Sequence, residues 1–331
     1  MIGIGADEKW SWMAWVYQWG IDCIKGIQRI ENPLLTELIK GITALGSEYF
    51  YIPVVLFMFW CIDERQGLRL GLLIILSSWV NGGCKELLRQ PRPYSLDPSV
   101  GRAFEPSYGI PSGHAQLSLT FWAWVSGFWR ERLWSAAILI ILVIGFTRLY
   151  LGLHFPTDLL AGWFLGGLIL LLYYGFGKRI EARLAAGGTR VRIWSVALVA
   201  LIMNASGSGR IFGGLMLGFG MGYSLMLQHV PFSAQAMVRG KKPALPLLAA
   251  RYALGITGAV LVYQGLKAIF PGEGSLFAEI PGWGANSPYY ELGCFVRYGL
   301  AGCWVTLGAP WLFLRLGLAS GRMTTLEKGE H

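Results

Sequence analysis

Charged residues are scarce in this sequence. Asp, Glu, Lys and Arg together make up 14% of its 331 residues, whereas soluble domains usually contain about 25%. Hydrophobic residues make up 54%. The shortage of charge argues against an ordinary soluble domain and favours a membrane protein.

Acidic residues are also fewer than basic ones, and the formal net charge is +9. Such an excess can indicate nucleic-acid binding. Here, however, the Lys and Arg residues lie in short segments between apolar runs and form no stripe on a polar domain. This distribution is typical of membrane proteins with positively charged cytoplasmic loops, and it argues against nucleic acid as a partner.

The sequence has few residues of the kinds that bind transition metals. Its four histidines and five cysteines are scattered, and no group of them has the spacing of a zinc or redox site. The cysteines are expected to be small apolar core residues, namely Cys23, Cys61, Cys84, Cys294 and Cys303. We therefore expect no metal and no other cofactor.

The sequence contains long apolar runs. Backbone groups inside a bilayer must hydrogen-bond internally, so such runs form helices. The expected fold is all-α, a polytopic bundle of about nine transmembrane helices near residues 42–62, 68–86, 113–130, 133–152, 157–176, 193–208, 211–229, 250–269 and 293–316. Residues 9–30 repeat apolar positions with a helical period, which predicts an N-terminal amphipathic helix lying in the membrane interface.

These features divide the chain into four regions. Residues 1–41 form the N-terminal interfacial region, and residues 42–176 form a helical core that contains every motif described below. Residues 177–192 are expected to be a basic cytoplasmic loop, and residues 193–331 a four-span region of unknown role. No small-residue cleavage site follows the first apolar segments, so we expect no cleaved signal peptide.

The charges of the connecting loops predict the orientation of the bundle. Loops rich in Arg and Lys alternate onto one face, which is therefore expected to be cytoplasmic. Segment 85–112 lies on the opposite face, yet it carries Lys85, Arg89, Arg92 and Arg102. Cations on that face need another explanation, and anion binding provides one. We predict an active site on the outer, periplasmic face of a bacterial inner membrane.

Three short polar segments lie at the outer ends of predicted helices, namely 85–93, 111–114 and 147–158. The guanidinium group of arginine matches phosphate oxygens, and lysine adds a point charge. Free N–H groups at the start of a helix also attract an anion. The segments supply groups of both kinds: Lys85, Arg92, Ser112, Gly113 and Arg148. We call these five residues the cationic cradle and predict that it binds phosphate.

Two of the four histidines lie beside this cradle. The spacing of His154 and Asp158 suits an imidazole whose Nδ1–H donates to a carboxylate and whose Nε2 is free to attack phosphorus. His114 is expected to protonate the leaving oxygen and later to activate water. We therefore predict a phosphohistidine at His154, with His114 as general acid and base and Asp158 as the orienting carboxylate.

Each of these parts also has a structural alternative. Lys85 and Arg92 could anchor helices at the interface, and His114 could be a helix-start residue. The His154–Asp158 pair could be an isolated hydrogen bond, and two histidines could instead bind a metal, although no third ligand recurs at ligand spacing. The presence of the complete set on one face favours an active site.

Three spacings resemble the signature motifs of the type 2 phosphatidic acid phosphatase superfamily: Lys85-x6-Arg92-Pro93, Pro111-Ser112-Gly113-His114 and Arg148-x5-His154-x3-Asp158. The resemblance implies phosphate binding by the cradle, the roles given above for the two histidines and Asp158, and no metal. The third motif of the family usually begins with serine, whereas this sequence has Thr147. The motifs cover residues 66–176, so the resemblance says nothing about the C-terminal spans.

The leading hypothesis is a membrane lipid phosphatase that hydrolyses a phosphate monoester or pyrophosphate. An amphiphile reaching the site laterally would carry its phosphate at the interface. The alternatives are a soluble phosphate ester as substrate, transfer of phosphate to a second lipid, and a transporter or flippase. Transporters usually have broken helices in matching halves, which this sequence does not show. The identity of the lipid and the oligomeric state are left open.

Overall fold

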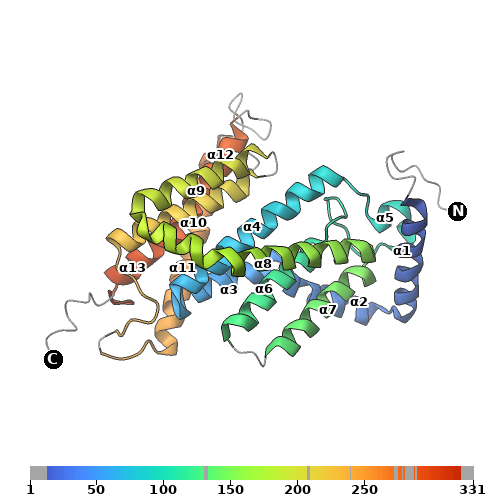
Figure 1. Cartoon of the computed structure of the whole chain (residues 1–331), viewed down its shortest axis with the longest axis horizontal. Coiled ribbons are helices and arrows are strands. Elements are labelled where there is room, and N and C mark those ends of the chain that lie inside the picture. Colours follow the sequence, from blue (N-terminus) through green and yellow to red (C-terminus); the bar gives the residue numbers. More distant parts are fainter. Residues whose placement is uncertain are drawn as a thin grey trace. The chain divides into compact units, whose positions relative to one another are not determined.

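The computed structural model describes residues 13–129, 133–206, 209–238, 240–271, 275–277, 279, 287 and 289–321. Within these ranges the chain is helical and forms no β-strand apart from isolated bridges (Figure 1). The principal helices are α1 (Ala14–Ile27), α2 (Pro33–Thr43), α3 (Glu48–Phe57), α4 (Glu64–Leu88), α5 (Pro93–Leu96), α6 (Gly113–Trp129), α7 (Trp134–Tyr150), α8 (Pro156–Ala186), α9 (Gly188–Ala205), α10 (Arg210–His229), α11 (Leu245–Ile269), α12 (Tyr290–Cys303) and α13 (Ala309–Arg315). The all-α prediction is confirmed for this part of the chain.

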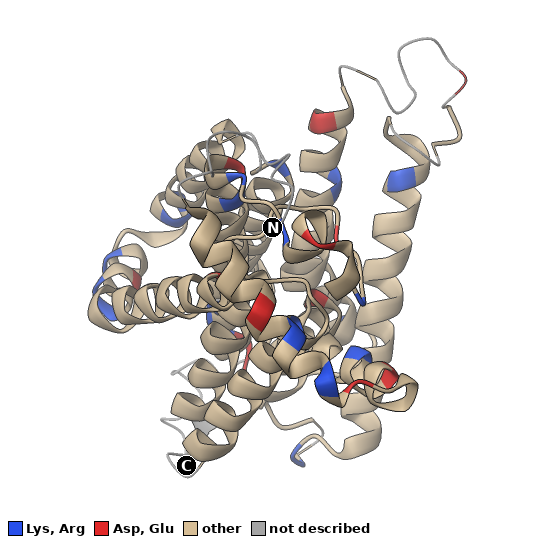
Figure 2. Ribbon diagram, turned by 90° about the vertical axis from the view of Figure 1, so that its right-hand side faces the viewer, with Lys and Arg blue, Asp and Glu red and all other residues tan. Residues whose placement is uncertain are grey.

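Five of the described helical segments are long and apolar enough to cross a membrane: Glu64–Leu96, Pro156–Ala186, Arg210–His229, Leu245–Ile269 and Tyr290–Arg315. A sixth span is possible if Pro33–Gly46 and Glu48–Ile62, which are bent by 44°, are taken together. Figure 2 shows long stretches of helix without charged residues, as expected for such spans. The protein is therefore a membrane protein.

The predicted count of nine spans is not confirmed. One reason is that α6 and α7 contain 17 residues each, slightly fewer than the roughly 20 that cross a bilayer. Another is that the predicted span 42–62 is interrupted at Ser47, whose backbone is extended. An apolar run in the sequence gives neither the bend nor the length of the helix that it forms.

Residues 177–192 were predicted to be a loop, but they form the end of α8 and the beginning of α9. The positive φ of Gly188, +72°, marks the junction between the two helices. Alanine and arginine are abundant in this segment and are good helix formers. The predicted amphipathic helix at 9–30 lies partly outside the described residues, and its place in the membrane interface remains a prediction.

The chain forms two compact units. The first comprises residues 1–52 and 76–177, and the second comprises residues 53–75 and 178–331. Every residue of the predicted site lies in the first unit.

In the first unit, α1 and α2 pack against the turn that joins α7 to α8. Three α1 side chains form a buried cluster with Val100 and Phe155, namely Tyr17, Ile21 and Ile24. Ile39 of α2 is buried against Leu151 and Leu153 of the same turn. Full burial of one such side chain is worth roughly 1.5–3 kcal/mol, so the N-terminal helices hold this turn in place.

In the second unit, α10 packs closely between α9 and α12 (Figure 1). A Cβ atom added to Gly218 of α10 would lie 1.9 Å from the carbonyl oxygen of Gly299 in α12, so only glycine permits this approach. The buried guanidinium of Arg251 donates to the carbonyl oxygens of Ala234 and Leu318 at 2.9 and 2.8 Å. These contacts hold the segments that contain Ala234 and Leu318 against α11.

Candidate active site

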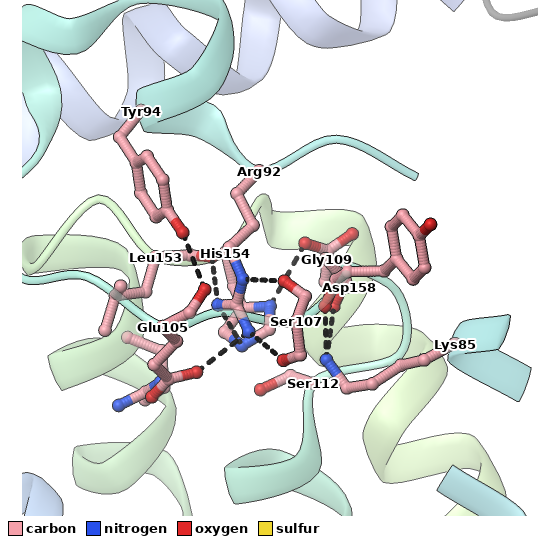
Figure 3. Close-up of polar contacts among 12 residues, drawn as sticks. Lys85, Arg92, Tyr94, Glu105, Ser107, Gly109, Ser112, Leu153, His154 and Asp158 are labelled. Atoms are coloured by element: carbon pink, nitrogen blue, oxygen red, sulfur yellow. Dashed lines mark hydrogen bonds and ion pairs between the residues drawn. The ribbon is translucent and has the colours of Figure 1, made fainter. Parts of the chain in front are cut away.

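The end of α4 directs the chain into the site. Arg89 follows the helix with a φ of +52°, in the left-handed region usually occupied by glycine at helix ends. The chain then turns, and the backbone of Gln90 accepts a hydrogen bond from Gly109 N at 2.8 Å. This pairing holds the segments before and after residues 93–108 together, so that Arg92 points inward from one of them (Figure 3).

Arg92 is 2% exposed, and all of its nitrogens are engaged. Nε donates to the Ser107 carbonyl oxygen at 2.6 Å, and Nη2 donates to Ser107 Oγ at 2.8 Å. Nη1 donates to the Leu153 carbonyl oxygen at 2.9 Å and lies 3.3 Å from His154 Nε2. The guanidinium is therefore fixed in orientation beside the imidazole.

His154 lies in a tight turn between α7 and α8. This turn requires glycine at position 152, where φ is +66° and a Cβ atom would lie 2.0 Å from the carbonyl oxygen of Val100. His154 is 1% exposed. Its Nδ1 lies 3.3 Å from Asp158 Oδ2, in the first turn of α8.

The Asp158 carboxylate is held by two further donors. Its Oδ2 accepts from Phe155 N at 2.9 Å, and its Oδ1 accepts from Gln90 Nε2 at 3.2 Å. An anion at the start of a helix is also stabilised by the helix dipole. With the carboxylate facing Nδ1 and an arginine N–H facing Nε2, the neutral imidazole carries its proton on Nδ1 and a lone pair on Nε2.

The pKa of His154 lies well below the ordinary value for histidine. Burial is the largest cause, because it disfavours the charged imidazolium, and the neighbouring cations Arg92 and Arg148 add to it. The imidazole is therefore neutral at physiological pH, as a nitrogen nucleophile must be.

The backbone at the start of α6 lies beside Asp158. Ser112 N donates to the Asp158 backbone oxygen at 3.0 Å. A Cβ atom on Gly113 would lie 3.2 Å from Asn81 Oδ1, so a larger residue would crowd α4. His114 follows in the first turn of α6, and a Cβ atom on Gly46 would lie 3.0 Å from its Cδ2. The N-terminal segment after α2 thus packs directly against His114.

Two further cations complete the cradle. Lys85 Nζ donates to the carbonyl oxygens of Tyr108 and Gly109. Arg148 is 1% exposed, and its Nη1 donates to Thr43 Oγ1 at 3.1 Å. Within the described chain, the buried Nε of Arg148 has no hydrogen-bond partner. A donor of this kind suits an incoming anion.

Four residues that sequence reasoning missed also contribute: Gln28, Thr43, Gln90 and Glu105. Gln28 Nε2 donates to the backbone oxygens of Val100 and Tyr150 at 2.8 Å each. Glu105 forms ion pairs with both Arg92 and Arg148. Gln90 lies within the first motif, but at a position where that motif specifies no residue, and the other three belong to no motif. The one usable signal in the sequence is that Glu105 is an acidic residue directly after the basic segment 85–102.

The first unit is thus a helical membrane scaffold that gathers cations, a helix start and a His–Asp pair around one position, as in an enzyme that acts on a phosphate group. The chain belongs to the PAP2 superfamily. The model of that superfamily matches residues 66–182, and a second model, the transmembrane extension of PAP2 superfamily phosphatases, matches residues 211–321. PAP2 phosphatases are hydrolases that act on phosphate esters. The second match relates the C-terminal region, to which the sequence motifs did not extend, to the same superfamily.

Several known proteins are similar to this chain. Phosphatidylglycerophosphatase B of Bacillus subtilis is 30% identical over 166 residues, which cover 46% of this chain and 80% of the relative. Lipid phosphate phosphatase delta of Arabidopsis thaliana is 24% identical over 282 residues, 76% of this chain and 67% of the relative. The crystal structure of a PAP2-type phosphatidylglycerolphosphate phosphatase from Bacillus subtilis aligns with a TM-score of 0.44 and 27% identity, covering 50% of this chain and 88% of that one.

Proposed function

We propose that this protein hydrolyses the phosphate monoester or pyrophosphate of a lipid through a phosphohistidine at His154. The observation that carries the proposal is the environment of one imidazole. His154 Nδ1 faces the Asp158 carboxylate, and His154 Nε2 faces the guanidinium of Arg92, each at 3.3 Å. This arrangement leaves a lone pair on the nitrogen that adjoins a phosphate-binding group.

In the first step, the Nε2 lone pair of His154 attacks phosphorus. The bond from phosphorus to the leaving oxygen breaks, and that oxygen keeps the electron pair and takes a proton from His114. The negative charge of the bound phosphate favours the protonated form of His114 before the step. Asp158 keeps the Nδ1 proton in place and stabilises the positive charge that develops on His154.

In the second step, neutral His114 takes a proton from water as the water oxygen attacks phosphorus. The nitrogen–phosphorus bond breaks, its electron pair returns to His154 Nε2, and inorganic phosphate forms. His114 is then protonated again for the next cycle. The cradle stabilises charge on the phosphoryl oxygens in both steps through Lys85, Arg92, Arg148, the Ser112 hydroxyl and the backbone N–H of Gly113.

A lipid substrate is supported by the membrane location of the chain and by its relatives. The relatives include enzymes named for phosphatidylglycerophosphate and for lipid phosphates. The cations of segment 85–112 support a site on the outer face of the inner membrane, because they depart from the cytoplasmic bias of the other loops. No chemical step in this mechanism requires a metal ion or another cofactor.

The test is phosphate release by the purified protein in detergent micelles. The substrate panel contains phosphatidic acid, phosphatidylglycerophosphate, a polyprenyl pyrophosphate and a sphingoid phosphate, each assayed with and without EDTA. We expect release from at least one lipid, unaffected by EDTA, and an acid-labile, base-stable phosphoenzyme from labelled substrate. His154→Ala should abolish both signals. His229→Ala, which changes an exposed histidine at the end of α10, should retain both.

Two other results would contradict the proposal. The first is a phosphoenzyme that persists in the His154→Ala variant. The second is activity lost in EDTA and restored by a divalent ion. Release of phosphate only when a lipid alcohol is added, with a phosphorylated lipid as product, would instead indicate a phosphotransferase.

A further inference from the structure

Glu105 occupies the cationic cradle from the segment between α5 and α6. Its Oε2 lies 2.8 Å from Arg92 Nη2, and its Oε1 accepts from Arg148 Nη2. Figure 3 shows the carboxylate beside the Arg92 guanidinium. The two arginines are the cradle residues expected to bind phosphate oxygens, so one carboxylate bridges them as two phosphate oxygens would.

The carboxylate lies on the solvent side of these arginines. Glu105 is 31% exposed, whereas Arg92 and Arg148 are 2% and 1% exposed. Burial raises the pKa of Glu105, but Arg148 and Arg92 outweigh that effect and bring its pKa to about 2. Glu105 is therefore an anion at neutral pH, in contact with the groups that a substrate phosphate must reach.

We propose that Glu105 is a resident anion of the cradle, which holds Arg92 and Arg148 until a substrate phosphate displaces its carboxylate. The inference rests on the proposed function and adds a step to it. A phosphate dianion and a carboxylate repel each other when both are in contact with the same guanidinium groups. When product phosphate leaves, the carboxylate returns to the arginines and opposes rebinding.

The local structure allows this exchange without moving the backbone. Tyr94 Oη donates to the Glu105 carbonyl oxygen at 2.8 Å, which tethers the main chain. Ser107 N also donates to that carbonyl oxygen, at 2.9 Å. The carboxylate can therefore leave the cradle by rotation of its side chain alone, while Ser107 keeps its two contacts with Arg92.

The test is the affinity of the purified full-length protein for inorganic phosphate, measured by calorimetry and as the inhibition constant in the lipid phosphatase assay. Glu105→Gln removes the charge and keeps the shape. We expect this variant to bind phosphate about tenfold or more tightly than the wild type, because a close like-charge contact is costly. The matched control is Glu86→Gln, since Glu86 is exposed and its carboxylate, within the part of the chain that the structure describes, pairs with Arg89 alone, at 3.9 Å. The control should bind phosphate as the wild type does.

Glu105→Asp is the second variant, because it keeps the charge but shortens the reach by one methylene. It should bind phosphate with an affinity between those of the wild type and Glu105→Gln. Unchanged or weaker phosphate binding by Glu105→Gln, with wild-type binding intact, would overturn the inference and mean that the carboxylate only positions the arginines. Failure of every variant to bind phosphate would overturn the proposed function as well.

Discussion

Arg92 Nη1 lies 3.3 Å from Nε2 of His154 and donates to the carbonyl oxygen of the preceding residue, Leu153, at 2.9 Å. The guanidinium thus fixes both the backbone of the turn and the position of the ring. In the mechanism that we propose, the same nitrogen holds a phosphoryl oxygen as the bond from Nε2 to phosphorus forms. Arg92 is therefore expected to act on the chemical step as well as on binding.

The roles of the two histidines can be separated by the leaving group. His154→Ala should give no burst and no turnover with any substrate, because the bond to phosphorus cannot form. His114→Ala should lose about 10²–10⁴-fold in activity on a lipid phosphate, whose alkoxide needs a proton. With nitrophenyl phosphate, it should still release a burst of nitrophenol about equal to the enzyme concentration, measured by stopped flow. A burst from the His154 variant, with none from the His114 variant, would mean that the two roles are the reverse of those proposed.

The outer-face location can be checked by labelling intact cells. Ser99 is exposed in the segment that carries the site, and Gly187 is exposed between α8 and α9. Cysteine at position 99 should react with an impermeant maleimide, whereas cysteine at position 187 should react only after permeabilisation. The parent protein measures the background from its own cysteines, of which Cys61 and Cys294 are buried. Labelling in the opposite order would reverse the predicted orientation.

Gln28 is expected to be important for stability. Its amide joins Val100 to Tyr150, so Gln28→Leu removes two buried hydrogen bonds and leaves two carbonyl oxygens without that donor. The loss should be about 2–4 kcal/mol, seen as a lower unfolding temperature and a shorter half-life of activity in detergent. Gln18→Leu is the control in the preceding helix α1, because Gln18 is exposed and, among the described residues, its side chain bonds to Asp22 alone. Equal effects of the two changes would contradict the role given to Gln28.

The depressed pKa of His154 has a consequence at acidic pH. Because the folded protein holds this imidazole neutral, the unfolded chain binds more protons below the ordinary histidine pKa of about 6.5. The stability contributed by His154 is therefore complete above that pH and is lost as the pH falls through it. Nitrogen-15 NMR of labelled histidine, assigned with His154→Ala, should show a neutral ring at pH 5.5. A ring half-protonated near pH 6.5 would contradict the burial argument.

The sequence predicts the components of the candidate site from local spacing. His154 and Asp158 are four residues apart at the start of a helix, and Ser112 and Gly113 begin another, so each pair has few possible arrangements. The helical fold also followed from the apolar runs. The number of spans did not, since a run of apolar residues does not determine where a helix bends or stops.

Only the tertiary structure decided which distant residues meet at these local elements. Glu105 reaches Arg148 across 43 positions, and Gln28 reaches Tyr150 across 122. Such contacts have no sequence period, because they depend on how α1, α2 and the segment before α6 pack around one turn. The sequence by itself determined that a group of cations and a His–Asp pair lie at the ends of helices. The packing decided that the cations already hold a carboxylate, because charges buried together must be paired.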